Sequence, residues 1–321
     1  MNYTQPSGPI PAEFLLIGLS WIQNQKLGVS FLFLVMYMMV ILGNCTMIIL
    51  IWTDHRLHKP MHVYIALLSL VDLSLSTAVV PKLLVILWFD SNGINSYACV
   101  TQMYFIYTMS GLESSLFALM ALDRYIAVCH PLRHSTIMTP SFISKTVIFV
   151  VIQCAIVILP LPIMTANLTF CKPNIIYQSY CEFVEIISQT CGDLSQFVIC
   201  MDLQVCLITG VDNVLIVFSY VNIFRVVQKL QSPEARWKTL NTCSAHAIML
   251  SLHYISTALP LLIFNFSPNP PLNIKFLPAI TTFLVVPLIN PIVFGLKTKE
   301  FQEGLKRLYW RRLLTNKIIK P

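Results

Sequence analysis

Charged side chains occur within or beside long apolar runs of this sequence, where a charge is costly. Asp72 lies within LSLVDLSLS and Glu113 within MSGLESSLF, while the pair Asp123–Arg124 ends a third apolar run. Ionisable groups in such places bind ions, pair with one another or act in switching. No metal-binding cluster, nucleophile–base pair or phosphate loop occurs in the sequence, so nothing in it indicates an enzyme.

Asp72 and Glu113 are expected at similar depth, on helices that start from opposite faces of a membrane. Two neighbouring carboxylates cannot both stay ionised without a cation, so either one is protonated or an ion such as sodium lies between them. Asn44 and Asn290 could complete the oxygen shell. The alternative is a polar network that only holds helices together. Beyond such a sodium ion, no cofactor is indicated.

The elements that position these residues are apolar segments of membrane-spanning length. Of the 321 residues, 56% are hydrophobic and 11% are charged, against about 25% charged residues in soluble domains. A span needs about 20 apolar residues. The sequence therefore predicts an all-α membrane protein, a seven-transmembrane helix bundle. The predicted segments are Leu27–Thr53, Pro60–Phe89, Ser91–Leu122, Thr146–Cys171, Leu194–Phe224, Thr239–Ile274 and Phe276–Leu296.

The basic residues indicate how the bundle is oriented. With the N-terminus outside, all but four of the 21 lysines and arginines fall on the inner side; the four are Lys26, Lys82, Lys172 and Lys275. This asymmetry predicts an outside N-terminus and an inside C-terminus. The net charge of +7 thus reflects topology and does not indicate nucleic acid as a partner.

Three regions follow from this topology. Residues 1–26 are predicted to form an extracellular tail, residues 27–296 the transmembrane domain, and residues 297–321 a cytoplasmic amphipathic helix and tail. We expect the first span to act as the targeting signal. The last region should lie along an anionic membrane surface, with a solvated basic tail as the alternative. Its apolar side holds Phe301, Leu305, Leu308 and Tyr309, flanked by Lys306, Arg307, Arg311 and Arg312.

Outer segments carry candidate modification sites. Asn2 begins an Asn-Tyr-Thr glycosylation pattern in the tail. Cys99, Cys171, Cys181 and Cys191 lie at or beyond outer helix ends, where disulfides form. Four cysteines permit three pairings, and the spacing does not choose among them. Prolines within the spans, such as Pro81, Pro260 and Pro291, predict bends that open cavities.

Motifs along nearly the whole chain resemble the odorant receptors, a branch of the rhodopsin-like G-protein-coupled receptors. They are LHKPMHVYIALLSLVDLSLSTAVVPKLL in the second span, MALDRYIAVCHPLRH at the end of the third, KTLNTCSAH at the start of the sixth and PLINPIVFGLKTKE in the seventh. Gly43–Asn44 and Ser219–Tyr220 also match. The second, third and sixth spans are most similar to the class I, fish-like branch.

The resemblance implies roles at the matching positions. Cys99 would pair with Cys181, and Cys171 with Cys191. Asp72 and Glu113 would form a sodium-linked pair. The cytosolic switch would comprise Asp123, Arg124, Tyr125, Tyr220, Asn290 and Pro291. The receptor would reside in the plasma membrane of olfactory cilia, bind a small volatile odorant and activate the stimulatory olfactory G protein, which raises cyclic AMP.

One face of four spans is predicted to bind the ligand, because residues at helical spacing share a face. Packing between helices is an equally good account of any single position. The set comprises Ile106, Tyr107, Ser110, Gly111, Gln204, Tyr254, Thr257, Ala258, Leu261, Ile280 and Phe283. Ile106 stands where aminergic receptors carry an aspartate, and no arginine or lysine ends the sixth span. Lys82 and Lys172 are the alternative partners for a carboxylate ligand. A neutral or weakly polar volatile ligand is therefore expected.

The sequence departs from the family pattern at two positions. Leu122 replaces the tyrosine that precedes the Asp–Arg–Tyr motif, and Phe294 ends the Asn–Pro motif without its usual hydroxyl. Both departures remove hydrogen-bonding groups from the switch. The other interpretations are a chemosensory receptor outside olfaction and, with less support, a transporter; the sequence has no inverted repeats to favour the latter.

Overall fold

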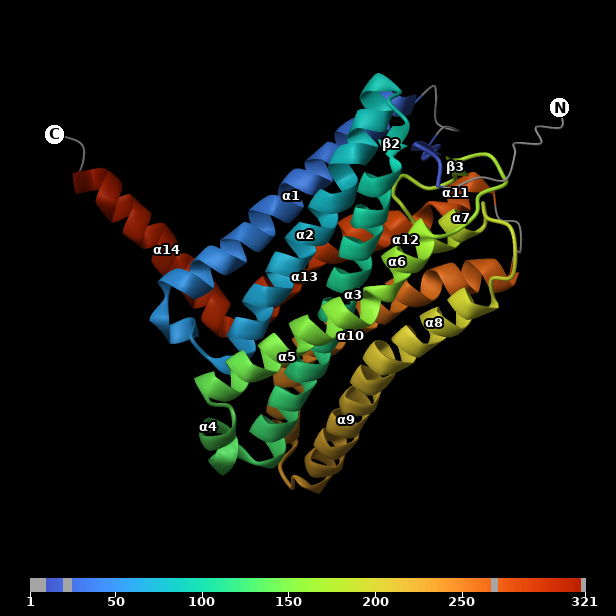
Figure 1. Ribbon diagram of the computed structural model, residues 1–321. Helices are drawn as coiled ribbons and strands as arrows, with labels where there is room; N and C mark the ends of the chain where they lie inside the picture. The colour runs from blue at the N-terminus through green and yellow to red at the C-terminus, as the bar shows by residue number, and fades with distance from the viewer. Residues whose placement is uncertain (1–9, 20–24, 267–270, 319–321) are drawn as a thin grey trace.

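Long helices dominate the computed structural model, which describes residues 10–19, 25–266 and 271–318 (Figure 1). Six helical units within that part are long and apolar enough to cross a membrane. They are α1 (Lys26–Thr53), α2 (Pro60–Phe89), α3 (Ser96–Cys129), α5 with α6 (Pro140–Ile158 and Pro160–Ala166), α8 with the π-helical η4 and α9 (Ser195–Val205, Cys206–Gly210 and Val211–Lys229), and α12 with the π-helical η5 and α13 (Leu277–Ile280, Thr281–Val285 and Val286–Lys297). The predicted sixth span falls in α10 (Pro233–Phe266).

The third, fourth, fifth and sixth spans each differ from a predicted boundary by five residues or more. The fifth ends at Lys229, five residues after Phe224, and the helix of the sixth begins at Pro233, six residues before Thr239. The fourth begins at Pro140, six residues before Thr146, because the Thr139 hydroxyl caps the helix by accepting a hydrogen bond from the Phe142 amide. The third continues past Leu122 to Cys129. As a result, Asp123 and Arg124 lie within α3 and not in the loop that follows it.

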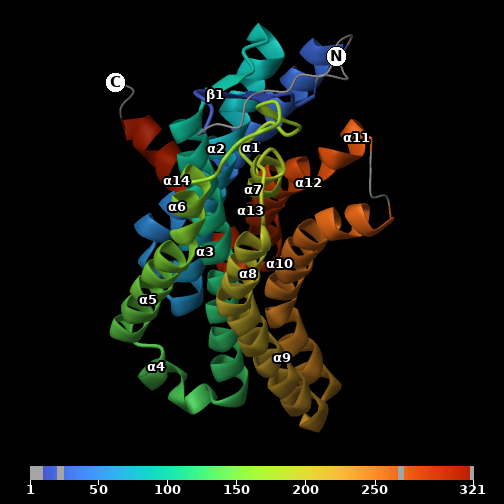
Figure 2. The same cartoon turned by 45° about the vertical axis from the view of Figure 1, so that its right-hand side comes forward.

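The helix α3 lies at the centre of the bundle, where it packs against α2, α5 and α9. Figure 1 shows α1 and α2 on one side of α3 and α8 on the other. In Figure 2, α9 runs beside α10. Proline occurs within α2 at Pro81, within α10 at Pro260 and within α13 at Pro291. Each proline removes a backbone donor from its helix, as the sequence analysis expected for bent spans.

The α1 and α13 helices approach each other closely at a glycine. A Cβ atom added to Gly43 would lie 2.8 Å from Cγ of Pro291, well inside van der Waals contact. The neighbouring Asn44 donates from Nδ2 to the Pro287 carbonyl oxygen at 2.9 Å. Gly43 and Asn44 therefore fix the position of α13 against α1.

The end of the bundle that carries the disulfides is called the loop end. A small sheet lies there, formed by β1 (Glu13–Leu16), β2 (Gly93–Asn95) and β3 (Ile175–Ile176) in the order β2-β1-β3. The strand β1 pairs antiparallel with β2 and parallel with β3. It lies within the predicted N-terminal tail, so part of that tail is bound to the bundle.

Two disulfides hold the long loop at this end. Cys99 near the start of α3 is joined to Cys181, with Cα atoms 5.4 Å apart, and Cys171 is joined to Cys191 at 5.8 Å. These are the two pairings that the resemblance implied. The short helix α7 (Phe183–Ile187) follows Cys181 directly, and the first disulfide thus ties α7 to α3.

The opposite end, which carries Asp123 and Arg124, is called the switch end. The short η2 (His55–Leu57), η3 (Pro131–Arg133) and α4 (His134–Ile137) lie here, as does the start of α14 (Lys299–Ile318). Figure 1 shows α14 leaving the bundle beside α1. Short α11 (Leu272–Lys275) precedes α12 at the loop end.

Candidate functional site

The Asp123 carboxylate lies between two basic side chains at the switch end. Its Oδ1 is 3.0 Å from Nε2 of His134, and its Oδ2 is 3.8 Å from Nε of Arg124. The Arg124 Nε atom is buried and has no hydrogen-bond partner among the described residues. The arginine is therefore weakly held, and its Asp neighbour is bound mainly by His134, a residue to which the sequence analysis gave no role.

The other predicted switch residues are brought to the same end or to the middle of the bundle. Tyr125 places its hydroxyl 3.2 Å from Nε2 of His130. Tyr220 joins α9 to α10, because its hydroxyl lies 2.8 Å from Nδ1 of His246. These contacts link α3, α9 and α10, the helices around Arg124.

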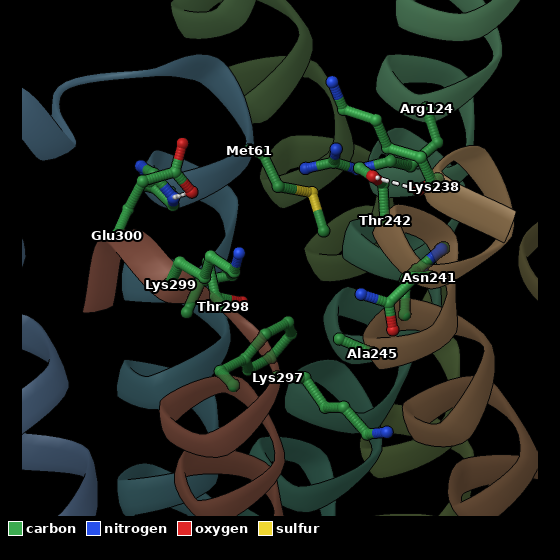
Figure 3. A pocket seen from close by; sticks show the side chains of 14 residues that line it. Met61, Arg124, Lys238, Asn241, Thr242, Ala245, Lys297, Thr298, Lys299 and Glu300 are labelled. Atoms are coloured by element: carbon green, nitrogen blue, oxygen red, sulfur yellow. Dashed lines mark hydrogen bonds and ion pairs between the residues drawn. The ribbon is translucent and has the colours of Figure 1, made fainter. Parts of the chain in front are cut away.

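A cleft of about 380 Å³ opens beside Arg124. Figure 3 shows Arg124, Lys238 and Thr242 on one side of it, Lys299 and Glu300 on the other, and Met61 between. The whole lining consists of Met61, His62, Ile65, Arg124, Lys238, Asn241, Thr242, Ala245, His246, Phe294, Lys297, Thr298, Lys299 and Glu300.

The cleft is electropositive. Arg124, Lys238, Lys297 and Lys299 face a single lining carboxylate, that of Glu300. The hydrogen bond that Lys59 donates to Glu300, at 2.6 Å, holds the pKa of Glu300 below its ordinary value. Glu300 is therefore ionised but already neutralised by Lys59, and the cleft is suited to an acidic or carbonyl-rich partner segment.

The start of α14 is clamped onto the bundle. Arg307 donates from Nε and Nη2 to Oδ2 of Asp54, at 2.9 and 2.7 Å, and Phe301 is fully buried. Gly304 faces Leu50 of α1. The side chains of Tyr309, Arg311 and Arg312 lie outside the described part, so the predicted amphipathic pattern is visible only through Leu308.

The two mid-depth carboxylates have partners on different helices. Asp72 accepts a hydrogen bond from Nδ2 of Asn290 on α13, at 2.8 Å. Glu113 lies 3.4 Å from Nδ1 of His253 on α10. This contact between Glu113 and His253 was not predicted from the sequence.

The surroundings of Asp72 fit a small cation. Oδ1 of Asp72, Oδ1 of Asn44 and Oδ1 of Asn290 are buried and have no hydrogen-bond donor among the described residues. Oxygen atoms of this kind are the ligands that hard cations take. These oxygens are free to accept a cation at Asp72. The sodium-linked pairing of Asp72 with Glu113 stays a prediction, and Glu113 contacts His253 in this structure.

Another buried carboxylate belongs to Asp212. Ser115 of α3 donates to its Oδ2 at 3.0 Å. This hydrogen bond joins α9 to α3.

Some of the predicted ligand-binding residues contact the disulfide-bonded loop, and others contact helices. Tyr107 donates its hydroxyl to Oε1 of Glu182 at 3.3 Å, and the Phe283 ring lies 5.0 Å from the Tyr180 ring. These two residues thus lie beneath the disulfide-bonded loop. Ile106 is buried, and Ser110, Ala258 and Ile280 are half-buried.

Other members of the set contact neighbouring helices. Gln204 donates to the Val157 carbonyl at 2.8 Å, and Gly111 faces Cys154 and Ile208. Tyr254 donates its hydroxyl to Asn213 of α9. Thr257, by contrast, donates to the His253 carbonyl within its own helix, α10, at 3.0 Å. The Leu261 side chain and Asn2 lie outside the described part. Glu182 and Tyr180 were not predicted, because a loop carries no periodicity that would place them.

The chain is similar to known proteins over most of its length. The family described as "Olfactory receptor" matches residues 33–312. Human olfactory receptor 51E1 is 36% identical over 296 residues, covering 92% of this chain and 93% of the relative. Human olfactory receptor 52N1 is 35% identical over 310 residues, covering 96% and 97%, and human olfactory receptor 52N2 is 36% identical over 307 residues, covering 95% of each.

Proposed function

The chain belongs to the olfactory receptor family, and from this we propose that its loop end binds a small odorant while its switch end engages a stimulatory heterotrimeric G protein. Family membership makes it a seven-transmembrane, G-protein-coupled odorant receptor of the plasma membrane and not an enzyme. Relatives in families 51 and 52 agree with the class I branch. The observation that carries the function is the match over nearly the whole chain.

We propose that the loop end faces outward and the switch end faces the cytosol. The disulfides Cys99–Cys181 and Cys171–Cys191 at the loop end support this orientation, because disulfides persist in oxidising space. The basic cleft at the switch end supports it too, since basic residues concentrate on the cytosolic side.

The odorant site proposed here lies between α3, α8, α10 and α12–α13, beneath the disulfide-bonded loop. Tyr107 and Phe283 support this position, because both contact that loop. A ligand that binds one arrangement of these helices better than another shifts the equilibrium toward it. The proposed ligand carries no carboxylate.

The proposed active state has Arg124 released and the cleft widened by a movement of α10. The 3.8 Å separation between Arg124 and Asp123 supports an arginine that is free to turn toward a partner. The G protein would insert a helix between α3, α10 and α13, a recurring mode of recognition. Positive charge from Lys238 and Lys297 would attract an acidic segment.

A sodium ion at Asp72 and a lipid contact at α14 complete the proposal. The free oxygens of Asp72, Asn44 and Asn290 support the ion. The Arg307–Asp54 clamp supports a fixed direction for α14, whose basic residues would lie on an anionic leaflet.

Cyclic AMP accumulation tests this function. Cells that express the receptor at the surface are exposed to a panel of chemically diverse volatile compounds, and dose-dependent cyclic AMP is expected for some of them. An Arg124→Ala variant at equal surface level should lose the response. A response that is strong only for carboxylic acids would contradict the proposed ligand class. A response that persists in Arg124→Ala would contradict the proposed switch.

A further inference from the structure

Three consecutive loop residues form the part of the disulfide-bonded loop that lies against the proposed odorant site. The Tyr180 ring contacts Phe283. The amide of Cys181 donates to Oε1 of Gln102 at 3.0 Å, and Glu182 accepts from Tyr107 at 3.3 Å. The disulfide and the contacts of Cys181 and Glu182 fix the segment on α3, and the contact of Tyr180 places it against η5. Both helices carry predicted ligand-binding residues.

Glu182 is held in this segment by neutral donors. Its Oε1 accepts from the Tyr107 hydroxyl and its Oε2 from the backbone amide of Glu185 at 2.8 Å. An ionised carboxylate can accept about four hydrogen bonds, so Glu182 has capacity for another donor. Burial raises the pKa of Glu182, which agrees with a carboxyl group that lacks a compensating charge.

The lysines at the loop end are engaged elsewhere. Lys26 is paired with Asp90, and Lys172 donates to the Ser188 carbonyl at 2.7 Å. Lys82 donates to the carbonyls of Ser91 and Gly93, at 3.0 and 2.7 Å.

The remaining lysine, Lys275, lies 5.6 Å from the centre of the Tyr177 ring. The sequence has no arginine or histidine in the segments of the loop end that the structure describes. Within that part no cation contacts Glu182.

We infer that Glu182 is the counter-charge for a small protonated amine, which binds beneath the loop beside Tyr107. The inference rests on the proposed odorant site, and it replaces the neutral or weakly polar ligand expected from the sequence by a cationic one. Ile106 leaves α3 without the aspartate that binds amines in other receptors, and Glu182 supplies the carboxylate from the loop instead. The rings of Tyr107, Tyr180 and Phe283 add faces that favour an organic cation. A carboxylate ligand would meet a like charge with no free cation nearby.

Linear alkylamines, alcohols and carboxylates of four to eight carbons are the probes, matched in chain length. Cells with equal surface receptor are assayed for cyclic AMP and, in parallel, for calcium release through a co-expressed promiscuous G protein. We expect the amine to be roughly tenfold or more as potent as the alcohol of equal length, and the carboxylate to be inactive.

The variant Glu182→Gln tests the effect of the negative charge apart from the effect of the hydrogen bonds. Glutamine retains an oxygen that can cap α7, but it removes the negative charge. The variant should lower amine potency roughly tenfold or more while alcohol potency stays within about threefold. Glu185→Gln is the matched control, the same change three residues along the loop, and should leave the amine response unchanged.

Each outcome decides the inference. Amines that fail to activate the wild-type receptor in both readouts overturn it, as does a carboxylate that outperforms its amine. An alcohol response with silent amines overturns the inference alone and leaves the odorant receptor function intact. An equal loss of potency for amine and alcohol in Glu182→Gln also overturns it. If that variant does not reach the surface, the wild-type series decides.

Discussion

Asp123 lies closer to His134 than to its neighbour Arg124. The carboxylate is 3.0 Å from His134 Nε2 and 3.8 Å from Arg124 Nε. His134 begins α4, so the contact ties α3 to the segment that follows it. The histidine competes for the carboxylate that would otherwise bind Arg124, and it thereby weakens the charge pair that restrains the switch.

Replacing His134 should strengthen that restraint. In His134→Ala, the Asp123 carboxylate loses its nearer partner and becomes available to Arg124 alone. We expect basal cyclic AMP to fall about two- to fivefold, in keeping with the ~1 kcal/mol upper range of partly exposed ion pairs. The measurement is basal cyclic AMP at matched surface expression.

A double-mutant cycle provides the control for this effect. Asp123→Asn removes the negative charge that both partners share, and it should raise basal signalling. His134→Ala should then add nothing in the Asp123→Asn background. An unchanged effect of His134→Ala in that background would show that the histidine acts through another contact.

The missing hydroxyls of the switch lead to a second prediction. Phe294 is buried and lines the cleft beside Arg124, and Leu122 directly precedes Asp123. The double variant Leu122→Tyr/Phe294→Tyr should increase the maximal agonist response, because added hydroxyls can hydrogen-bond in an active arrangement that now lacks them. The measurement is the maximal cyclic AMP response; no change at equal surface expression would contradict the role of these hydroxyls.

Sodium should stabilise the receptor through Asp72. A ligand at ten times its dissociation constant adds ~1.4 kcal/mol to the stability of the state that it binds. The melting temperature of purified receptor should therefore rise when sodium chloride replaces an equal concentration of N-methylglucamine chloride. Asp72→Asn should lose this rise, whereas Asp202→Asn, a change of an exposed carboxylate, should keep it. An equal rise in Asp72→Asn would exclude this ion site.

The spans could be predicted from the sequence because the bilayer imposes a local rule of length and polarity. The segment from Pro60 to Phe89 was predicted with the boundaries that α2 has. Apolar composition does not show where a helix begins when a capping residue decides its first turn. The start of the fourth span was therefore misplaced, because the Thr139 hydroxyl caps that helix.

Contacts between distant segments could not be predicted in the same way. The pairing of Glu113 with His253, of Asp123 with His134 and of Glu182 with Tyr107 depends on how helices and loops are arranged in space. Hydropathy and spacing report on one segment at a time. The strand β1 was missed for the same reason, because its partners β2 and β3 come from two other loops.

The contact between Gly43 and Pro291 gives a last prediction, on stability. A methyl group at Gly43 would lie 2.8 Å from Pro291 Cγ, so α1 and α13 must separate to accept it. Overpacking of this kind costs about 1–3 kcal/mol, more than the ~1 kcal/mol by which alanine improves on glycine within a helix. Gly43→Ala should therefore lower the melting temperature of the purified receptor.

Gly28 is the matched control, because it lies in the same helix and a Cβ atom there would meet nothing within 4 Å. Gly28→Ala has the helix-forming gain without the clash, and it should leave the melting temperature unchanged or raise it. Displacing Pro291 would also move Asn290, which donates to Asp72. Gly43→Ala should thus reduce the stabilisation by sodium, and Gly28→Ala should not. Equal melting temperatures for the two variants would show that α13 adapts to the methyl group and that Gly43 does not fix its position.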